Sequence, residues 1–165
     1  PETIDYFKLN PEDILAPIDG LVTAVDTTLT QKKIRISQQL HTNKLILMPC
    51  DGKIDINIFI DGLFLPAKIS NASSLNARRE ICINQDKSSS SSNTDFDVSL
   101  ILWGSPLARY LASPVLEGRK LRTGVPIAVL LLHGEIDIIL PTHFNLQVNL
   151  GDLCIAGKTV LAKLN

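Results

Sequence analysis

The sequence predicts a mostly β protein, either a two-layer sandwich or a barrel-sandwich-like domain with one or two short helices. Three observations lead to this fold class: apolar and polar residues alternate along most of the chain, β-branched residues concentrate where they alternate, and turn residues recur at short intervals. The chain has 165 residues, of which 45% are hydrophobic and 20% are charged. Such a chain suits one soluble domain with a sizeable core, so we treat residues 1–165 as a single domain.

Eight segments alternate clearly enough to be predicted as strands. Turn sequences such as Ile-Asp-Gly, Cys-Asp-Gly and Asn-Leu-Gly-Asp separate several of them, because Asp bonds to the local backbone and Gly accepts a positive φ. In chain order the predicted strands are 20–28, 32–37, 53–60, 79–85, 97–103, 125–132, 135–140 and 158–164.

Two further segments complete the prediction. Residues 86–97 form a polar stretch with five consecutive serines and no apolar residue before Phe96, which predicts a mobile loop between two strands. Residues 104–112 predict a short helix, because Ser105 can act as its N-cap and Pro106 suits the first helical position.

A weak internal repeat is also present. "PIDGLV" at 17–22 resembles "PCDGKI" at 49–54, and "DGKIDINIF" resembles "HGEIDIILP". Each copy reads as a turn that leads into a strand. The duplication predicts two similar β layers that face one another.

The composition argues against nucleic-acid binding, because the net charge is −1 and aromatic residues make up only 5%. The three cysteines, Cys50, Cys82 and Cys154, form no CxxC pair, which favours buried free thiols in a reducing compartment. No apolar run approaches the roughly 18 residues of a membrane span, and no signal peptide is visible. The chain begins with Pro1 rather than methionine, which leaves open whether a further segment precedes it.

The apolar run at 130–141 is interrupted by His133, Gly134 and Glu135. These three residues are either a tight turn between two strands or the remains of a reactive site. Gly104 and Ser105 form the chain's one Gly-Ser pair, a bond type that can cleave itself to leave a pyruvoyl group. A helix cap is the favoured interpretation of this pair, since Pro106 restricts the backbone that cleavage must distort.

The three histidines give weaker signals. His41 is a candidate acid or base, although its polar surroundings favour an exposed turn residue. His133 and His143 have no carboxylate or cysteine at ligand spacing, so we predict no metal site. The basic stretch 117–122 is read as a solvated hairpin in preference to a phosphate site.

Five stretches follow one another in a characteristic order and spacing. Together they resemble the short form of phosphatidylserine decarboxylase over nearly the whole chain, and in that family the first usually follows a membrane-inserting segment. The stretches are "YFKLNPEDILAPIDGLV", "MPCDGKI", "DGLFLPAKISNASSLNARRE", "SPLARYLASPVLEGRKLRTG" and "VNLGDLCIAGKTVLA".

The resemblance gives the interrupted run a meaning. Before the corresponding strand the family has the sequence Phe-Gly-Ser-Arg, and it cleaves itself at the Gly-Ser bond. An alignment that starts from Asp137 places His133 on the glycine, Gly134 on the serine and Glu135 on the arginine. Sliding by one residue places Gly134 on the glycine and Glu135 on the serine. Neither register supplies the hydroxyl that attacks the glycine carbonyl, so the resemblance implies a degenerate cleavage site.

Other family positions are partly kept. Asp19 matches the aspartate of the family's self-cleavage triad, whereas His41 is only a partial echo of its histidine, so both are predicted as vestigial catalytic residues. Asn76 and Arg78 match the family's Asn-Glu-Arg and are predicted to bind a headgroup, with Ala77 in place of the glutamate. Gly104 and Ser105 align elsewhere.

The resemblance therefore implies a decarboxylase-like protein of phospholipid metabolism that has lost its pyruvoyl group, so no cofactor is expected. The interpretation is a pseudoenzyme acting as a scaffold, a regulatory partner or a phospholipid-headgroup binder; the alternative is an active enzyme converting phosphatidylserine to phosphatidylethanolamine. Expected partners are a phospholipid headgroup or membrane surface and a second copy or an active relative. We expect a cytoplasmic location, peripheral to or anchored at the inner membrane through a segment upstream of Pro1.

Overall fold

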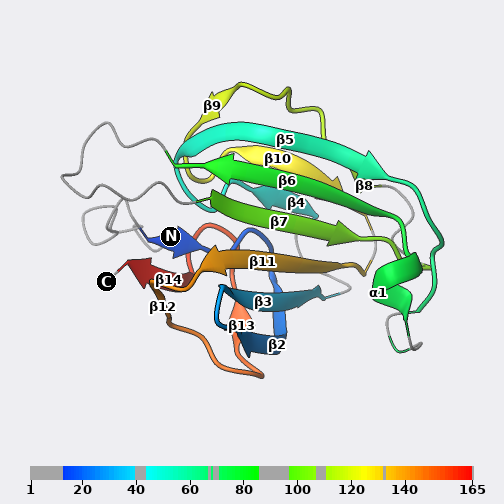
Figure 1. Cartoon of the computed structure of the whole chain (residues 1–165), viewed down its shortest axis with the longest axis horizontal. Helices are drawn as coiled ribbons and strands as arrows, with labels where there is room; N and C mark the ends of the chain where they lie inside the picture. The colour runs from blue at the N-terminus through cyan, green and yellow to red at the C-terminus, as the bar shows by residue number, and fades with distance from the viewer. Residues whose placement is uncertain are drawn as a thin grey trace, which may run out of the picture.

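A computed structural model describes residues 13–39, 44–66, 68, 71–85, 97–106, 111–131 and 133–164. The mostly β prediction is confirmed, and the largest element is an antiparallel sheet of eight strands (Figure 1). Across this large sheet the order is β13 (Leu153–Cys154), β2 (Gly20–Thr27), β3 (Gln31–Gln38), β11 (Glu135–Pro141), β7 (Asp97–Trp103), β6 (Arg78–Asn84), β5 (Gly52–Ile60) and β9 (Lys120–Leu121).

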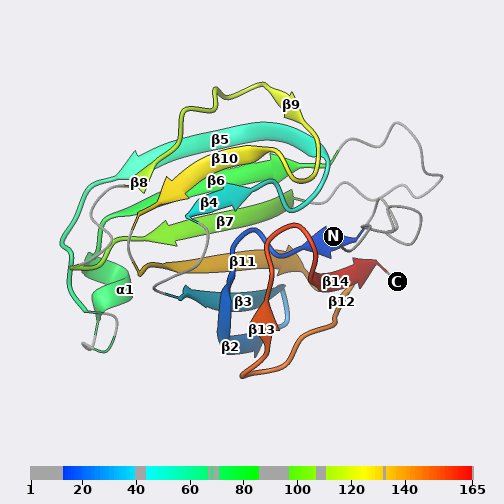
Figure 2. The ribbon, with the colours of Figure 1, turned by 180° about the vertical axis from the view of Figure 1, so that it is seen from behind.

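Two three-stranded sheets lie on one face of the large sheet, which makes the architecture sandwich-like (Figure 2). A four-residue helix, α1 (Ala72–Leu75), lies at one end of the large sheet. The first small sheet is ordered β1 (Ile14–Leu15), β14 (Val160–Leu164), β12 (Phe144–Leu146), and the second β4 (Leu45–Leu47), β10 (Pro126–Leu130), β8 (Leu111–Ala112).

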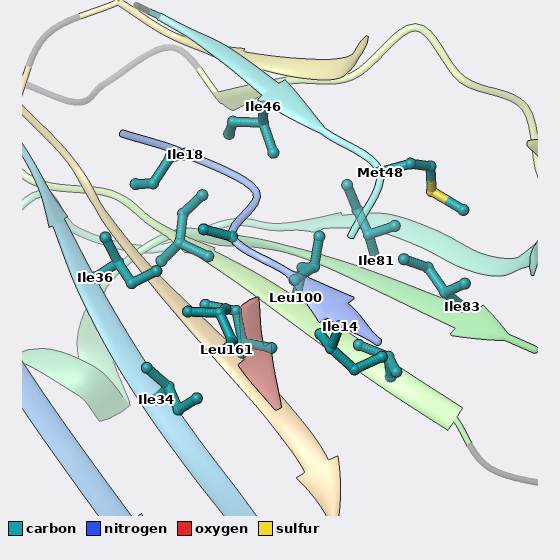
Figure 3. Close-up of a cluster of buried hydrophobic side chains, with 14 of the residues drawn as sticks. Ile14, Ile18, Ile34, Ile36, Ile46, Met48, Ile81, Ile83, Leu100 and Leu161 are labelled. Atoms are coloured by element: carbon teal, nitrogen blue, oxygen red, sulfur yellow. The ribbon is translucent and has the colours of Figure 1, made fainter. Parts of the chain in front are cut away.

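The core fills the space between the large sheet and the two small ones (Figure 3). Strand alternation sends every second side chain inward, as in β7, where Val98, Leu100 and Leu102 are buried and their neighbours are not. Burial of this continuous apolar layer is the main force that holds the sheets together. Its labelled members in Figure 3 are Ile14, Ile18, Ile34, Ile36, Ile46, Met48, Ile81, Ile83, Leu100 and Leu161.

All eight predicted strands are present, with ends within two residues of the expected ones. The predicted helix at 104–112 is wrong at its end, because Leu111–Ala112 form β8 and pair with β10. Tertiary pairing overrides the N-cap signal there, and residues 107–110 lie outside the described residues. The predicted loop does link β6 to β7, but Asp97 already belongs to β7 and residues 86–96 lie outside the described residues, as does His41.

The internal repeat is real but arranged differently from the prediction. The match extends over residues 14–20 and 46–52, where five of seven residues are identical. Instead of facing one another as two layers, the two copies enter the same large sheet as β2 and β5, one in each half. Their turns also hydrogen-bond reciprocally: Leu15 N donates to Pro49 O (2.9 Å) and Leu47 N donates to Pro17 O (2.8 Å).

The whole topology follows this pseudo-twofold relation. We call β4–β10 the second copy, and β1–β3 together with β11–β14 the first copy. The large sheet runs β13-β2-β3-β11 in the first copy and β9-β5-β6-β7 in the second, and each copy adds one small sheet. The second copy is therefore inserted into the first between β3 and β11, and the chain re-enters the first copy at 131–134.

Candidate active site

The interrupted run at 130–141 is a corner between two sheets. β10 ends at Leu130 in a small sheet, and β11 begins at Glu135 in the large sheet. The two strands do not form a hairpin with each other, because β11 pairs with β3 and β7. His133 is exposed at this corner and Gly134 is buried.

Gln38, at the end of β3, holds this corner in place. Its side-chain Nε2 donates to Leu130 O (3.0 Å), and its Oε1 accepts from Gly134 N (3.3 Å). Two further bonds complete the contact: Gln38 N donates to Gly134 O (2.8 Å), and the ring Nδ1 of His133 donates to Gln38 O (2.6 Å). Gln38 is only 2% exposed, so its amide satisfies corner groups that water does not reach.

Asp19 lies at the same end of the large sheet as the corner. The residue after it, Gly20, pairs with Gln38 in the register of β2 and β3, so the turn of Asp19 and the corner flank the same end of β3. The Asp19 carboxylate accepts the backbone N–H of Ala156 at 2.7 Å. In the second copy Asp51 does the same for Thr123 N (2.7 Å), which indicates that this turn acceptor belongs to the repeated fold.

A partly buried ion pair lies one row from the corner, on the face of the large sheet opposite the core. Arg35 Nε and Nη2 donate to the two carboxylate oxygens of Asp137 at 2.7 and 2.9 Å, and Trp103 Nε1 donates to Asp137 Oδ2 at 2.8 Å. Hydrogen bonding to Asp137 raises the pKa of the Arg35 guanidinium. Glu135 extends the network, since its Oε2 lies 3.9 Å from Arg35 Nη1.

Arg78 joins the corner through a row of paired residues. Glu135 pairs with Trp103, and Trp103 pairs with Arg78, so the three side chains lie side by side on the outer face. The Arg78 guanidinium lies 5.9 Å from the Trp103 ring centre, and its Nε donates to Glu80 at 2.8 Å. The Glu135 carboxylate and the Arg78 guanidinium therefore lie on either side of the Trp103 indole. Their backbones are two strand spacings apart, which is roughly 10 Å.

Asn76, the other predicted headgroup residue, is 5% exposed and bonded to the backbone. Its amide donates to Leu65 O (2.9 Å) and Gly104 O (3.0 Å) and accepts from Leu65 N (2.8 Å). These bonds join the segment before α1 to the end of β7. Headgroup binding by Asn76 stays a prediction, with its amide committed to this joint.

Sequence reasoning missed Gln38, Arg35 and Trp103. A signal existed for Gln38, because a polar residue at the end of the predicted strand 32–37 is placed to cap whatever follows. The bonds of Arg35 and Trp103 to Asp137 depend on the register of three strands that are distant in sequence. Among the described residues, no group of three or more His, Cys, Asp or Glu side chains could hold a metal ion.

The fold and the corner define a class: a duplicated β sandwich in which the chain re-enters the first copy at a corner between two sheets. The family model described as phosphatidylserine decarboxylase matches residues 31–162. The chain belongs to the phosphatidylserine decarboxylase family.

Three relatives named phosphatidylserine decarboxylase proenzyme illustrate the likeness. The chain is 26% identical to that of Ruegeria pomeroyi over 177 residues, covering 96% of this chain and 78% of the relative. It is 26% identical to that of Ehrlichia ruminantium (97% and 65% covered) and 28% identical to that of Nitrosomonas eutropha (91% and 69% covered). The chain thus spans about two thirds to three quarters of the length of these relatives. No solved structure matches the chain.

In the family, the pyruvoyl group is made from a serine of the chain itself. His133, Gly134 and Glu135 carry no hydroxyl. Within the described part of the chain, no helix is long and apolar enough to span a membrane.

Proposed function

We propose that this chain is a non-catalytic member of its family, which keeps the fold but forms no pyruvoyl group and acts by binding. The observation that carries the proposal is the corner between β10 and β11. The position aligned with the family's serine is Gly134, or Glu135 in the shifted register. The absent hydroxyl removes the first bond-forming step of processing.

Neither candidate residue can replace serine chemically. Gly134 has no side-chain atom that could attack a carbonyl. A Glu135 carboxylate has no oxygen on Cβ, so no β-elimination could leave dehydroalanine, the precursor of a pyruvoyl group. Ser37 pairs with Glu135 but lies within β3 after Ile36, so attack by its hydroxyl would not convert a residue at the corner.

Intact-mass measurement tests the proposal. The purified protein is expected as one chain of 18.1 kDa, without a product that reacts with a carbonyl probe. An ethanolamine-release assay with phosphatidylserine is expected to give no product above the buffer rate. Two fragments meeting at 133–135, one of them ketone-bearing, would show an active decarboxylase and refute the proposal.

A restored variant sharpens this test. The double substitution His133→Gly and Gly134→Ser recreates the family's Gly-Ser pair at the unshifted register. Fragments from this variant, alongside an intact wild-type chain, would show that the absent hydroxyl alone blocks processing. The control Arg119→Ser creates a Gly-Ser pair with Gly118 on the exposed turn before β9 and is expected to stay intact.

Binding of an aminophospholipid headgroup, which carries a primary ammonium group and a phosphate, is the function that the outer-face row favours. Glu135 could face an ammonium group and Arg78 a phosphate, with Trp103 between them. Such a headgroup carries both charges within reach of this row. The proposal uses the orientation of these three side chains and does not require catalysis.

Liposome co-sedimentation tests headgroup binding at equal surface charge. Vesicles containing phosphatidylserine are expected to retain more protein than vesicles containing the same fraction of phosphatidylglycerol. Arg78→Gln is expected to abolish the difference, whereas Arg119→Gln, at an exposed position beside β9, is expected to leave it unchanged. Equal retention on both vesicles would contradict specific binding.

A further inference from the structure

The two edge strands of the large sheet occupy corresponding places in the two copies. β13 lies at one edge and β9 at the other, in the lower and the upper part of Figure 1. β13 pairs with β2 through Leu153 and Leu21, and β9 pairs with β5 through Lys120 and Lys53. Each edge strand is two residues long and is preceded by a tight turn.

The turns before these strands match in detail, so corresponding residues can be assigned. Gly151 has φ 90° and donates its N–H to Val22 O (2.9 Å), while Gly118 has φ 87° and donates to Ile54 O (2.7 Å). A second turn follows each strand, where Ala156 N binds Asp19 as Thr123 N binds Asp51. Residues 149–157 therefore correspond one by one to residues 116–124.

The chemistry of the two edges is opposite. Three large apolar side chains protrude from the first copy: Leu150 is 69% exposed, Leu153 72% and Ile155 53%. We call these three residues the apolar edge. The corresponding residues of the second copy are Glu117, Lys120 and Arg122, all of them exposed.

This contrast shows that the fold does not require apolar side chains at the edge. The same backbone, with the same hydrogen bonds, presents charged side chains in the second copy. Exposure of Leu and Ile side chains to water is unfavourable, and in the first copy no core contact offsets this cost. An external apolar partner would explain why they stand there.

We propose that the apolar edge inserts into the interfacial layer of a phospholipid bilayer. Its side chains stand on two turns and a two-residue strand, the arrangement of a protruding tip, and the segment between β12 and β13 forms the lowest point of the molecule in Figure 1. A stable protein interface buries about 800 Å² on each partner, more than three side chains supply. Shallow insertion needs only apolar groups that project beyond the polar surface.

The position of the apolar edge fits a bilayer that also reaches the candidate site. Leu153 pairs with Leu21, Leu21 with Ser37 and Ser37 with Glu135, so edge and corner share one row of the sheet. Three strand spacings separate their ends, roughly 14 Å. The proposal itself rests only on the apolar edge and holds whether or not the corner binds a headgroup.

Co-sedimentation with vesicles of pure phosphatidylcholine tests this, because such vesicles are neutral and offer no phosphatidylserine. The wild-type chain is expected to bind them with little loss at high salt. The double variant Leu150→Glu and Leu153→Glu is expected to bind about tenfold more weakly or worse. The matched control is Leu116→Glu, which changes a 68%-exposed leucine in the corresponding turn of the second copy and is expected to bind like wild type.

Three results would overturn the proposal. These are a wild-type chain that does not bind the vesicles, a double variant that binds equally well, and an equal loss in the Leu116→Glu control. Light scattering after gel filtration adds an outcome: a wild-type dimer that the double variant converts to a monomer, without vesicle binding, would assign the apolar edge to a second copy instead. Unchanged thermal unfolding of the variants confirms that they are folded.

Discussion

The guanidinium of Arg35 and the carboxylate of Asp137 face each other across β3 and β11 in a two-pronged contact of 2.7 and 2.9 Å. Asp137 is 2% exposed, and Trp103 supplies a third hydrogen bond. A charge is tolerated at such a site only while its acceptor positions are satisfied. This contact therefore fixes the register of β3, β11 and β7 beside the corner.

Asp137→Asn is expected to lower the free energy of unfolding by about 2–4 kcal/mol, because it removes a charge that Arg35 faces and one of two good acceptors. Urea denaturation at pH 7 measures the change. The control is Asp26→Asn, where a 62%-exposed carboxylate lies 3.9 Å from Lys33 Nζ and a loss within about 0.5 kcal/mol is expected. Equal losses at the two positions would contradict the special role of Asp137.

Gln38→Ala is expected to loosen the corner, because it leaves Leu130 O and Gly134 N without their side-chain partner. The expected cost is about 1–3 kcal/mol. Limited proteolysis is expected to cut the variant faster at 131–134 than the wild type. Gln31→Ala, at the exposed beginning of the same strand, is the control and should change neither the stability nor the rate of cleavage. If the corner of Gln38→Ala resisted the protease as well as that of the wild type, the holding role of Gln38 would be contradicted.

Much of the fold could be predicted because long strands carry their own signal. Two-residue strands such as β8 and β13 have no periodicity to detect, and they exist only through pairing with a neighbour. The helix predicted at 104–112 failed at Leu111 for this reason, since β10 offers it a partner that local sequence does not reveal. The insertion of the second copy into the first was equally hidden, because it is a property of strand order.

The candidate site could be predicted only where a family motif or an interruption marked it. His133, Gly134 and Glu135 stood out against apolar neighbours. Gln38 is 92 residues from the Leu130 carbonyl that it binds, so no local pattern joins them. The charge contrast between the two edge strands likewise needs the structural correspondence of the copies.

Alkaline pH is expected to destabilise the protein through its buried thiols. Burial raises the pKa of Cys50 from 9.0 to about 12 and that of Cys154 to about 11. Between about pH 9 and these values the unfolded chain releases protons that the folded chain keeps, so stability falls as pH rises. Below pH 9 the contribution is fully present, and each thiol costs about 1.4 kcal/mol per pH unit above it.

Urea denaturation at pH 7.5 and pH 10 measures this loss. In Cys50→Ala the loss between the two pH values is expected to be smaller by roughly 1 kcal/mol, although the variant is less stable at both. Val98→Ala, which also shortens a fully buried side chain but removes no titrating group, is the matched control and should keep the wild-type slope. An unchanged slope in Cys50→Ala would contradict the assignment.

Gly20 and Gly52 test whether the two copies obey the same packing constraint. A Cβ on Gly20 would overlap Ser37 O and lie 2.7 Å from Ile36 Cγ2, and a Cβ on Gly52 would lie 2.6 Å from Asn84 O and 2.7 Å from Ile83 Cγ2. Because the obstructing oxygens are backbone atoms of the paired strand, the strands would have to separate.

Gly20→Ala and Gly52→Ala are each expected to cost about 1–3 kcal/mol in thermal or urea unfolding, with similar values for the two. Thr23→Ala, at an exposed position on β2, should cost about 0.5 kcal/mol or less. If one glycine tolerated alanine while the other did not, the packing of β2 and β5 against their partner strands would differ between the two copies. That result would weaken the correspondence that contrasts Leu153 with Lys120, because Gly20 pairs with Cys154 and Gly52 pairs with Leu121, directly beside these two residues.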